Sequence, residues 1–363
     1  MNACDRALAQ KIFENSNIIK KNNLNIIVKD IPDLDKKGVF DPREFFIRNA
    51  IAQFAKRMPP AIDVDTIRKT TRTYCVNINE KQINQSEIFV DVGGRQVKVY
   101  VYEPRERVPN ACPAFIYIHG GSFMSSAAEY YKDPCMFIAE KASCVVFNIE
   151  YSLAPENMYP VAINECEKLV EYINDNCDKY NIDINRIAIG GDSAGANLAI
   201  VTALNCPDKI KPSYLALLYP CVDLCGKDGL YSWDESDYEI DDSQRELIVS
   251  RLSLGRTDGN GNDQLMEMIV KGYLGKEYEQ LQRNPQASPI YADVSALPRT
   301  QIFTAEFDGL RPQGEYFAKK LQENNVDNQI FRYRGVSHAF LDYFGILPQA
   351  EAALLEIVEQ LKK

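Results

Sequence analysis

The chain has 363 residues, of which 45% are apolar and 25% charged, and its formal net charge is −10 at pH 7. This length and composition suit one large α/β domain with an accessory part, or two domains. The acidic residues are spread along the chain, which argues against nucleic acid or an anionic membrane as a partner. No run of 18 apolar residues occurs, so we expect no membrane span.

The ten cysteines lack the regular spacing of a disulfide scaffold. Several stand inside apolar runs, such as Cys144 before Val145 and Val146, a pattern typical of buried free thiols. The N-terminal segment has neither a continuous apolar stretch nor a small-residue cleavage site. We therefore expect a cytoplasmic protein with reduced cysteines.

Residues 1–85 carry no recognisable catalytic motif. Asp41 and Pro42 are typical of a helix start, and apolar residues follow at helical spacing, which predicts an amphipathic helix with Phe45, Phe46, Ile51 and Phe54 on its apolar face. A second short helix is predicted after Asp63. We expect residues 1–85 to be a helical region that forms part of a cap over the active site; packing on the flank of the main domain is the alternative.

The main domain is predicted at 86–363 and begins with a β-hairpin. Apolar residues alternate on either side of Gly93 and Gly94, which supply the positive φ of a tight turn. After Pro113, continuous apolar runs alternate with helical stretches. Strands are predicted at 114–118, 144–149, 186–189, 214–218, 301–305 and 329–333, and helices at 134–142, 160–177, 194–204, 312–324 and 346–361. Strands that are apolar on both faces predict an α/β fold with a mostly parallel central sheet and helices on both faces.

The alternation is interrupted once, at about 224–286. This segment is rich in Asp, Gly, Asn and Ser and has helical pieces near 242–254 and 262–273. Because it follows the carboxyl end of the strand at 214–218, we expect it on the face of the sheet where ligands bind. We interpret it as the second part of a helical cap; a surface excursion with no role in the site is the alternative.

A G-x-S-x-G pentapeptide spans Gly191, Asp192, Ser193, Ala194 and Gly195. An apolar strand pattern precedes it and an Ala/Leu-rich helix pattern follows, and this context indicates a nucleophile elbow, a tight turn that exposes the serine hydroxyl. The helix directs its unpaired N–H groups toward the place where an oxyanion would form. The alternative is an ordinary turn between a strand and a helix.

The chain has only two histidines, and each follows a predicted strand. A nucleophilic serine needs a histidine as its base and an acidic residue that orients the histidine. In this architecture the triad runs Ser, then Asp or Glu, then His in chain order. This order selects His338 as the base and excludes His119, because His119 precedes Ser193. A histidine titrates near neutrality, so it can take the hydroxyl proton and return it to the leaving group. The strand at 301–305 is followed by Asp308, which we predict to orient the imidazole, with Glu306 as the alternative.

His119, Gly120 and Gly121 follow the first long strand and form an HGGG-type element. In such a turn, backbone N–H groups point at the negative charge that develops on the substrate carbonyl oxygen. We therefore predict an oxyanion hole made by the N–H groups of Gly120, Gly121 and Ala194.

These motifs together resemble the hormone-sensitive-lipase-like group of α/β-hydrolase esterases, the bacterial family IV carboxylesterases. The residues that carry the resemblance lie in the family's order between about 114 and 345: HGGSF at 119–123, YSLAPE at 151–156, Tyr159 and Pro160, GDSAGANLA at 191–199, Tyr219 and Pro220, EFDGLR at 306–311, and SHAF around His338. Ser122 replaces the family's third glycine, and Pro312 and Gln313 stand where acidic residues are usual.

The resemblance implies a catalytic triad of Ser193, Asp308 and His338 and hydrolysis of short-chain or aryl carboxylic esters, acetyl esters included, without a cofactor or metal. An acyl-enzyme on Ser193 is the expected intermediate. An amidase or peptidase that uses the same triad, or a non-catalytic hydrolase-like binding protein, is the alternative. The expected partner is a small-molecule ester. The oligomeric state stays open, with a homodimer among the options.

Overall fold

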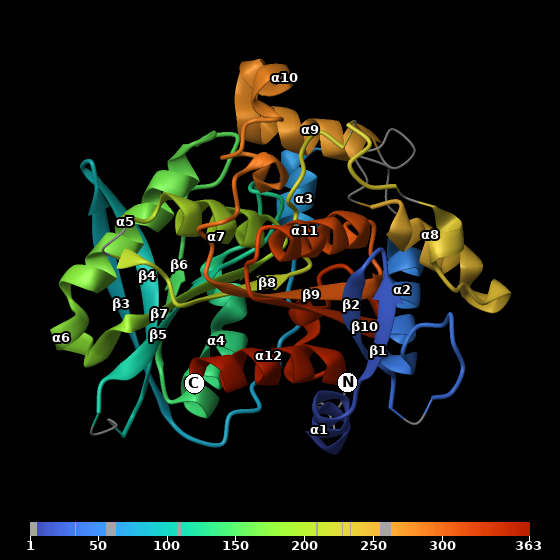
Figure 1. Cartoon of the computed structure of the whole chain (residues 1–363), viewed down its shortest axis with the longest axis horizontal. Coiled ribbons are helices and arrows are strands. Elements are labelled where there is room, and N and C mark those ends of the chain that lie inside the picture. The colour runs from blue at the N-terminus through green and yellow to red at the C-terminus, as the bar shows by residue number, and fades with distance from the viewer. Residues whose placement is uncertain are drawn as a thin grey trace.

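A computed structural model describes residues 6–32, 34–55, 63–106, 110–207, 210–226, 228–232, 234–254 and 263–363. Among them, a single ten-stranded sheet has the order β1-β2-β10-β9-β8-β7-β5-β6-β4-β3 (Figure 1). Its strands are β1 (Asn17–Lys21), β2 (Leu24–Lys29), β3 (Ile83–Val92), β4 (Arg95–Pro104), β5 (Cys112–Ile118), β6 (Val145–Ile149), β7 (Ile182–Asp192), β8 (Tyr214–Leu218), β9 (Arg299–Phe307) and β10 (Asn328–Ser337). Neighbours from β2 to β6 are parallel, and the outer pairs at each edge are antiparallel.

The central strands are buried on both faces. Every residue of β5, β6 and β8 is buried, which is why these strands show no polar alternation; Asn148 of β6 is buried as well. All six predicted parallel strands are confirmed, as is the hairpin of β3 and β4 around Gly93 and Gly94. The structure therefore has the predicted α/β fold with a mostly parallel sheet.

Helices cover both faces of this sheet (Figure 1). One face carries α5 (Val161–Asp175), α7 (Ala194–Asn205) and α11 (Arg311–Glu323), and the other carries α1 (Arg6–Glu14), α4 (Lys132–Ala142) and α12 (Pro348–Leu361); α6 (Cys177–Tyr180) is a single turn. Two large clusters of buried apolar side chains, one on each face, form the core. Within the described residues, no helix is long and apolar enough to cross a membrane.

The remaining helices lie at the carboxyl ends of the parallel strands or beside β10. They are α2 (Pro42–Ala55), α3 (Val64–Thr70), α8 (Arg245–Leu252), α9 (Asp263–Leu274) and α10 (Tyr278–Leu281). The helix expected after Asp63 is confirmed as α3. The Asp63 side chain caps this helix by accepting from the backbone N–H of Thr66. The helical pieces expected near 242–254 and 262–273 are confirmed as α8 and α9.

The expectation of a helical N-terminal region is wrong for residues 17–29. These residues form β1 and β2, and β2 extends the sheet as a parallel neighbour of β10, with Ile26 opposite Ile330. Leu24, Ile26 and Val28 point into the core. The local sequence shows only a short apolar run, and its strand conformation depends on a partner about 300 residues later in the chain.

The amphipathic face expected on α2 is also corrected. Phe46 and Ile51 are 63% and 41% exposed, whereas Glu44 and Arg48 on the same helix are buried. Phe45 is partly buried against an apolar cluster, and the side chain of Phe54 lies outside the described residues. The polar residues face inward because they have hydrogen-bonding partners at the end of β10.

A substitution in the N-terminal hairpin tests its place in the sheet. Ile26→Ala should lower the free energy of unfolding by about 2–4 kcal/mol, because it removes fully buried methyl groups from the core. Ile18→Ala on the edge strand β1, where the side chain is 68% exposed, should change it by less than about 0.5 kcal/mol. Urea unfolding of both variants measures the difference, and equal stabilities would show that β2 does not pack in the sheet.

Candidate active site

Ser193 stands between the end of β7 and the start of α7. Its backbone has φ 51° and ψ −116°, a conformation that is strained for any residue with a Cβ atom. The Ser193 N–H donates to the Leu218 carbonyl at 2.9 Å, which fixes the turn against the end of β8. The predicted elbow is therefore present as a sharp, strained turn from strand to helix.

The two glycines of the pentapeptide are required by close packing. A Cβ atom on Gly191 would lie 2.4 Å from the Ile118 carbonyl oxygen, and one on Gly195 would lie 2.0 Å from the same atom. Such contacts are too short for any side chain, so both positions require glycine. The elbow and the end of β5 are consequently in direct backbone contact.

A continuous hydrogen-bonded chain joins the three residues predicted as a triad. Ser193 Oγ lies 2.9 Å from His338 Nε2, and His338 Nδ1 lies 2.8 Å from Asp308 Oδ2. A carboxylate only accepts, so Nδ1 carries the ring proton and Nε2 is left to accept from the serine hydroxyl. The other Asp308 oxygen accepts from the Leu310 N–H at 2.8 Å, which fixes the buried carboxylate. Each residue follows the carboxyl end of a different strand: β7, β9 or β10.

Glu306 and His119, the other candidates for the acid and the base, make contacts outside the triad. Glu306 accepts from the backbone N–H of Gly335 at 2.8 Å and contacts Arg334, so it is held against β10 and not against His338. His119 is fully buried, and its ring stacks on Tyr151 at 4.3 Å between centroids. Burial lowers the pKa of His119 to about 4, so its ring is neutral at pH 7.

Asp192, whose role the sequence analysis missed, connects the elbow to the glycine turn after β5. Its Oδ1 accepts from the Tyr117 hydroxyl at 2.7 Å and from the Gly120 N–H at 2.8 Å. Its Oδ2 lies 3.3 Å from the Tyr131 hydroxyl, which lies 3.0 Å from Asp342 Oδ1. The only signal for it in the sequence is an acidic residue at the variable position before the serine.

The carboxyl groups of Asp192 and Asp342 share one hydroxyl proton. Tyr131 can donate to only one of them, which favours an additional proton on the pair. Burial raises the pKa of Asp192 to about 6. Burial, followed by the charge of Asp192, raises the pKa of Asp342 to about 7.

The contacts of Asp192 correct one part of the predicted oxyanion hole. The Gly120 N–H is bound to a carboxylate, so it is not available to a substrate oxygen. The backbone N–H groups of Gly121, Ser122 and Ala194 have no acceptor among the described residues. Gly121 and Ser122 have φ of 113° and 57°, which turns the chain tightly here.

The segment at 224–286 contacts the glycine turn from one side. Tyr273 of α9 stacks its ring on Phe123 at 3.9 Å, and its carbonyl accepts from the Tyr159 N–H at 2.9 Å. From α3, Arg68 donates to the Met124 carbonyl at 2.8 Å. Two segments far apart in sequence therefore pack on the same turn.

The same segment also contacts the loop that carries Asp308. The Tyr238 hydroxyl donates to the Asp308 carbonyl at 3.3 Å. A Cβ atom on Gly309 would lie 2.2 Å from the Leu254 carbonyl, just after α8. The end of α8 is thus in backbone contact with the residue next to Asp308.

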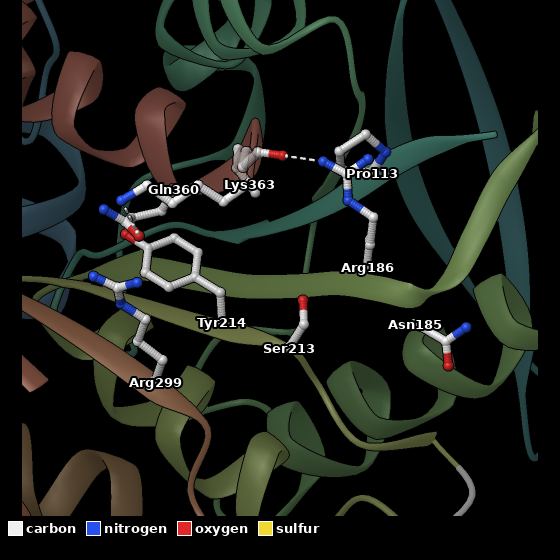
Figure 2. Close-up of a pocket in the computed structure, with 9 residues that line it drawn as sticks. Pro113, Asn185, Arg186, Ser213, Tyr214, Arg299, Gln360 and Lys363 are labelled. Carbon is white, nitrogen blue, oxygen red and sulfur yellow. Dashed lines mark hydrogen bonds between the residues drawn. The ribbon is translucent and has the colours of Figure 1, made fainter. Parts of the chain in front are cut away.

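A cavity of about 240 Å³ lies near the amino ends of the parallel strands, away from the triad (Figure 2). It is lined by residues near the starts of parallel strands and by the end of α12, namely Pro113, Asn185, Arg186, Ser213, Tyr214, Arg299, Gln360, Leu361 and Lys363. Because the triad follows the carboxyl ends of the strands, this cavity is separate from the candidate site.

The raised pKa of Asp192 predicts a pH-dependent effect of Asp192→Asn. A buried carboxyl with a raised pKa stabilises the fold fully below its unfolded pKa, and this stability is lost as pH rises through about 6. Asparagine does not titrate, so the variant should gain about 1–2 kcal/mol relative to wild type between pH 5 and pH 8. Urea unfolding at both pH values measures this gain.

Asp63→Asn is the control, because hydrogen bonds from Thr66 lower the pKa of Asp63. Stability from this group is present above its unfolded pKa and is lost only on acidification below that value, so the difference between Asp63→Asn and wild type should be the same at pH 5 and pH 8. A pH-independent difference for Asp192→Asn would contradict the prediction.

Comparison with known proteins identifies the family. Residues 115–342 match the model of a family described as having the alpha/beta hydrolase fold. The chain is 31% identical to an arylesterase of Saccharolobus solfataricus over 248 residues. This alignment covers 68% of this chain and 73% of that protein. The chain is 30% identical over 265 residues to an acetyl esterase of Salmonella dublin, covering 71% and 73%.

Among solved structures, a hyperthermophilic esterase from Pyrobaculum calidifontis superposes with a TM-score of 0.71 at 30% identity, covering 89% of this chain and 98% of that one. The resemblance to hormone-sensitive-lipase-like carboxylesterases is confirmed. The chain belongs to the α/β-hydrolase family.

Proposed function

We propose that the protein is a serine carboxylic ester hydrolase in which Ser193 is the nucleophile, His338 the general base and Asp308 the residue that orients the base. The hydrogen-bonded chain from Ser193 Oγ to His338 and Asp308, at 2.9 and 2.8 Å, carries this assignment. The esterase relatives support carboxylic ester hydrolysis as the reaction.

In the acylation step, His338 Nε2 accepts the hydroxyl proton while Ser193 Oγ attacks the ester carbonyl. Asp308 stabilises the imidazolium that forms, since its buried carboxylate accepts from Nδ1. The imidazolium then gives its proton to the leaving alcohol, and the acyl group stays on Ser193. Water repeats the sequence and releases the acid.

The oxyanion of the tetrahedral intermediate needs donors that are free before the substrate binds. The N–H groups of Gly121, Ser122 and Ala194 are free among the described residues, whereas the Gly120 N–H is bound to Asp192. We assign the hole to Gly121, Ser122 and Ala194, the last at the N-terminus of α7, where the helix dipole favours negative charge. Ser122 contributes through its backbone, so the third glycine of the family is not needed for the donor itself.

The proposed substrates are small short-chain or aryl esters, as the names of the acetyl esterase and arylesterase relatives suggest. The proposed cap consists of α3 and the segment at 224–286, because both pack on the turn at 121–124. Residues 17–29 are part of the sheet and are excluded from this cap. A cytoplasmic location and a homodimer stay predictions from the sequence.

Hydrolysis of p-nitrophenyl esters from acetate to long acyl chains tests the function. Wild type should favour short chains, and Ser193→Ala should lower turnover by at least about 10⁴-fold, because it removes the nucleophile. Retained activity in Ser193→Ala would overturn the assignment. Matching amide substrates form the second arm: release from amides without ester turnover would favour the amidase alternative.

Gly121→Ala tests the oxyanion turn. The new Cβ atom would lie 2.2 Å from the Ser125 carbonyl at a φ of 113°, so the turn must move and its N–H groups with it. We expect kcat to fall about 10²- to 10³-fold. Gly94→Ala is the matched control, since it also has positive φ but no neighbour within 4 Å, and it should lower stability without lowering kcat. Equal kcat values for the two variants would contradict this role of the turn.

A further inference from the structure

Helix α2 directs two charged side chains, alongside the buried Ile47, toward the end of β10. Glu44 is fully buried and Arg48 is 6% exposed. Arg48 Nε donates to Glu44 Oε1 at 2.8 Å, one helical turn away. A buried ion pair of this kind lies directly against the turn that carries His338.

Both members of the pair hold the backbone of that turn. Glu44 Oε1 accepts from the Ser337 hydroxyl at 2.6 Å and from the Ser337 N–H at 3.1 Å. Arg48 Nη2 donates to the carbonyl of His338 itself at 3.2 Å, and its guanidinium lies over the Tyr343 ring at 5.0 Å. The pair therefore contacts the chain before, at and after His338.

Stability alone does not account for this arrangement. Burying two charges costs desolvation energy that an ion pair recovers only with complete hydrogen bonding, and well-packed apolar residues usually stabilise a protein as much. Glu44 Oε2 is buried and has no hydrogen-bond partner among the described residues. The hydrogen bonds that the pair does form beyond itself go to Ser337 and His338, which points to a role in placing the imidazole.

We propose that Glu44 and Arg48 are positioning residues for His338 and that their opposite charges cancel at the imidazole, so that the pair holds the turn without moving the pH range in which His338 acts as a base. The proposal rests on the proposed function, in which His338 becomes a cation when Ser193 attacks. A fixed positive charge nearby disfavours that cation, and a fixed negative charge favours it. The pair offsets the two effects while it fixes the turn.

Other charged groups also face this region. Asp308 contacts the ring directly, Asp192 and Asp342 act on it electrostatically from the elbow and from the turn after β10, and Arg251 of α8 lies near the ion pair. All four residues are kept in every variant below. Asp192 and Asp342 titrate within the measured pH range and Arg48 itself lowers the pKa of Asp342, so the limb of Glu44→Gln is the more direct measure of the effect of the pair on His338.

The test compares Glu44→Gln, Arg48→Met, the double variant and Arg48→Lys. Each is measured as kcat and KM for p-nitrophenyl acetate from pH 4.5 to 9, per active site titrated with a fluorophosphonate. Glu44→Gln leaves Arg48 unbalanced, so the acidic limb of kcat/KM should move to lower pH by about 0.5 unit. Arg48→Met leaves Glu44 unbalanced, so the limb should move to higher pH by about 0.5 unit.

In the double variant the acidic limb should lie within about 0.2 pH unit of the wild-type limb. Its kcat should still be about 10-fold lower than that of wild type, because the turn is no longer held. KM should change less than about 2-fold in all variants, since the pair contacts the turn and not the ester. Arg48→Lys keeps the charge, so it should keep the wild-type limb even where it lowers kcat.

Lys168→Met is the control, because it removes one cation from an exposed pair with Glu171 on α5. It should change neither the limb nor kcat. Shifts of Glu44→Gln and Arg48→Met in the same direction, or no shift in either, would overturn the proposal. Failure of the proposed function is distinct: the wild type itself would then have no serine that the fluorophosphonate titrates, or would be titrated and yet not hydrolyse p-nitrophenyl acetate. If Arg48→Met does not fold, Glu44→Gln and Arg48→Lys still decide the result.

Discussion

The hydrogen bonds of Asp192 are the constraint on which the rest of the site depends. Its carboxyl group binds the Gly120 N–H, and its backbone leads directly into Ser193, so the nucleophile and the oxyanion turn are held in one rigid unit. The same contact occupies the Gly120 N–H, so the free N–H groups of the glycine turn are those of Gly121 and Ser122 instead of Gly120 and Gly121. The fold bears an electrostatic cost for this link, since burial raises the pKa of Asp192 to about 6.

Much of the fold and most of the site could be predicted from the sequence, because both depend on short-range patterns. Buried parallel strands are continuous apolar runs, and the residues that follow β7, β9 and β10 must meet at one edge of the sheet. Chain order then separates His338 from His119. The strands at 17–29, the inward face of Glu44 and the engaged N–H of Gly120 could not be predicted, because each depends on a partner distant in sequence.

Three segments that are separate in the sequence support the site. The segment at 224–286 packs on the glycine turn through Tyr273 and on the acid loop through Tyr238. Helix α3 reaches the glycine turn through Arg68, and α2 holds the histidine turn through Arg48. The triad side chains come from the sheet, whereas their surroundings come from elements outside it. Substrate preference can therefore change in α3 and in the segment at 224–286 while the triad stays the same.

The pairing of β2 and α2 with β10 has a consequence for the newly made chain. Glu44 and Ser337 are 293 residues apart, so at 5–20 residues per second the N-terminal segment waits roughly 15–60 s on the ribosome for its partner. During this time Leu24, Ile26 and Val28 have no sheet to bury them. The early chain thus leaves these apolar side chains exposed, which favours aggregation, and the active site is completed only after β10 and His338 have been made.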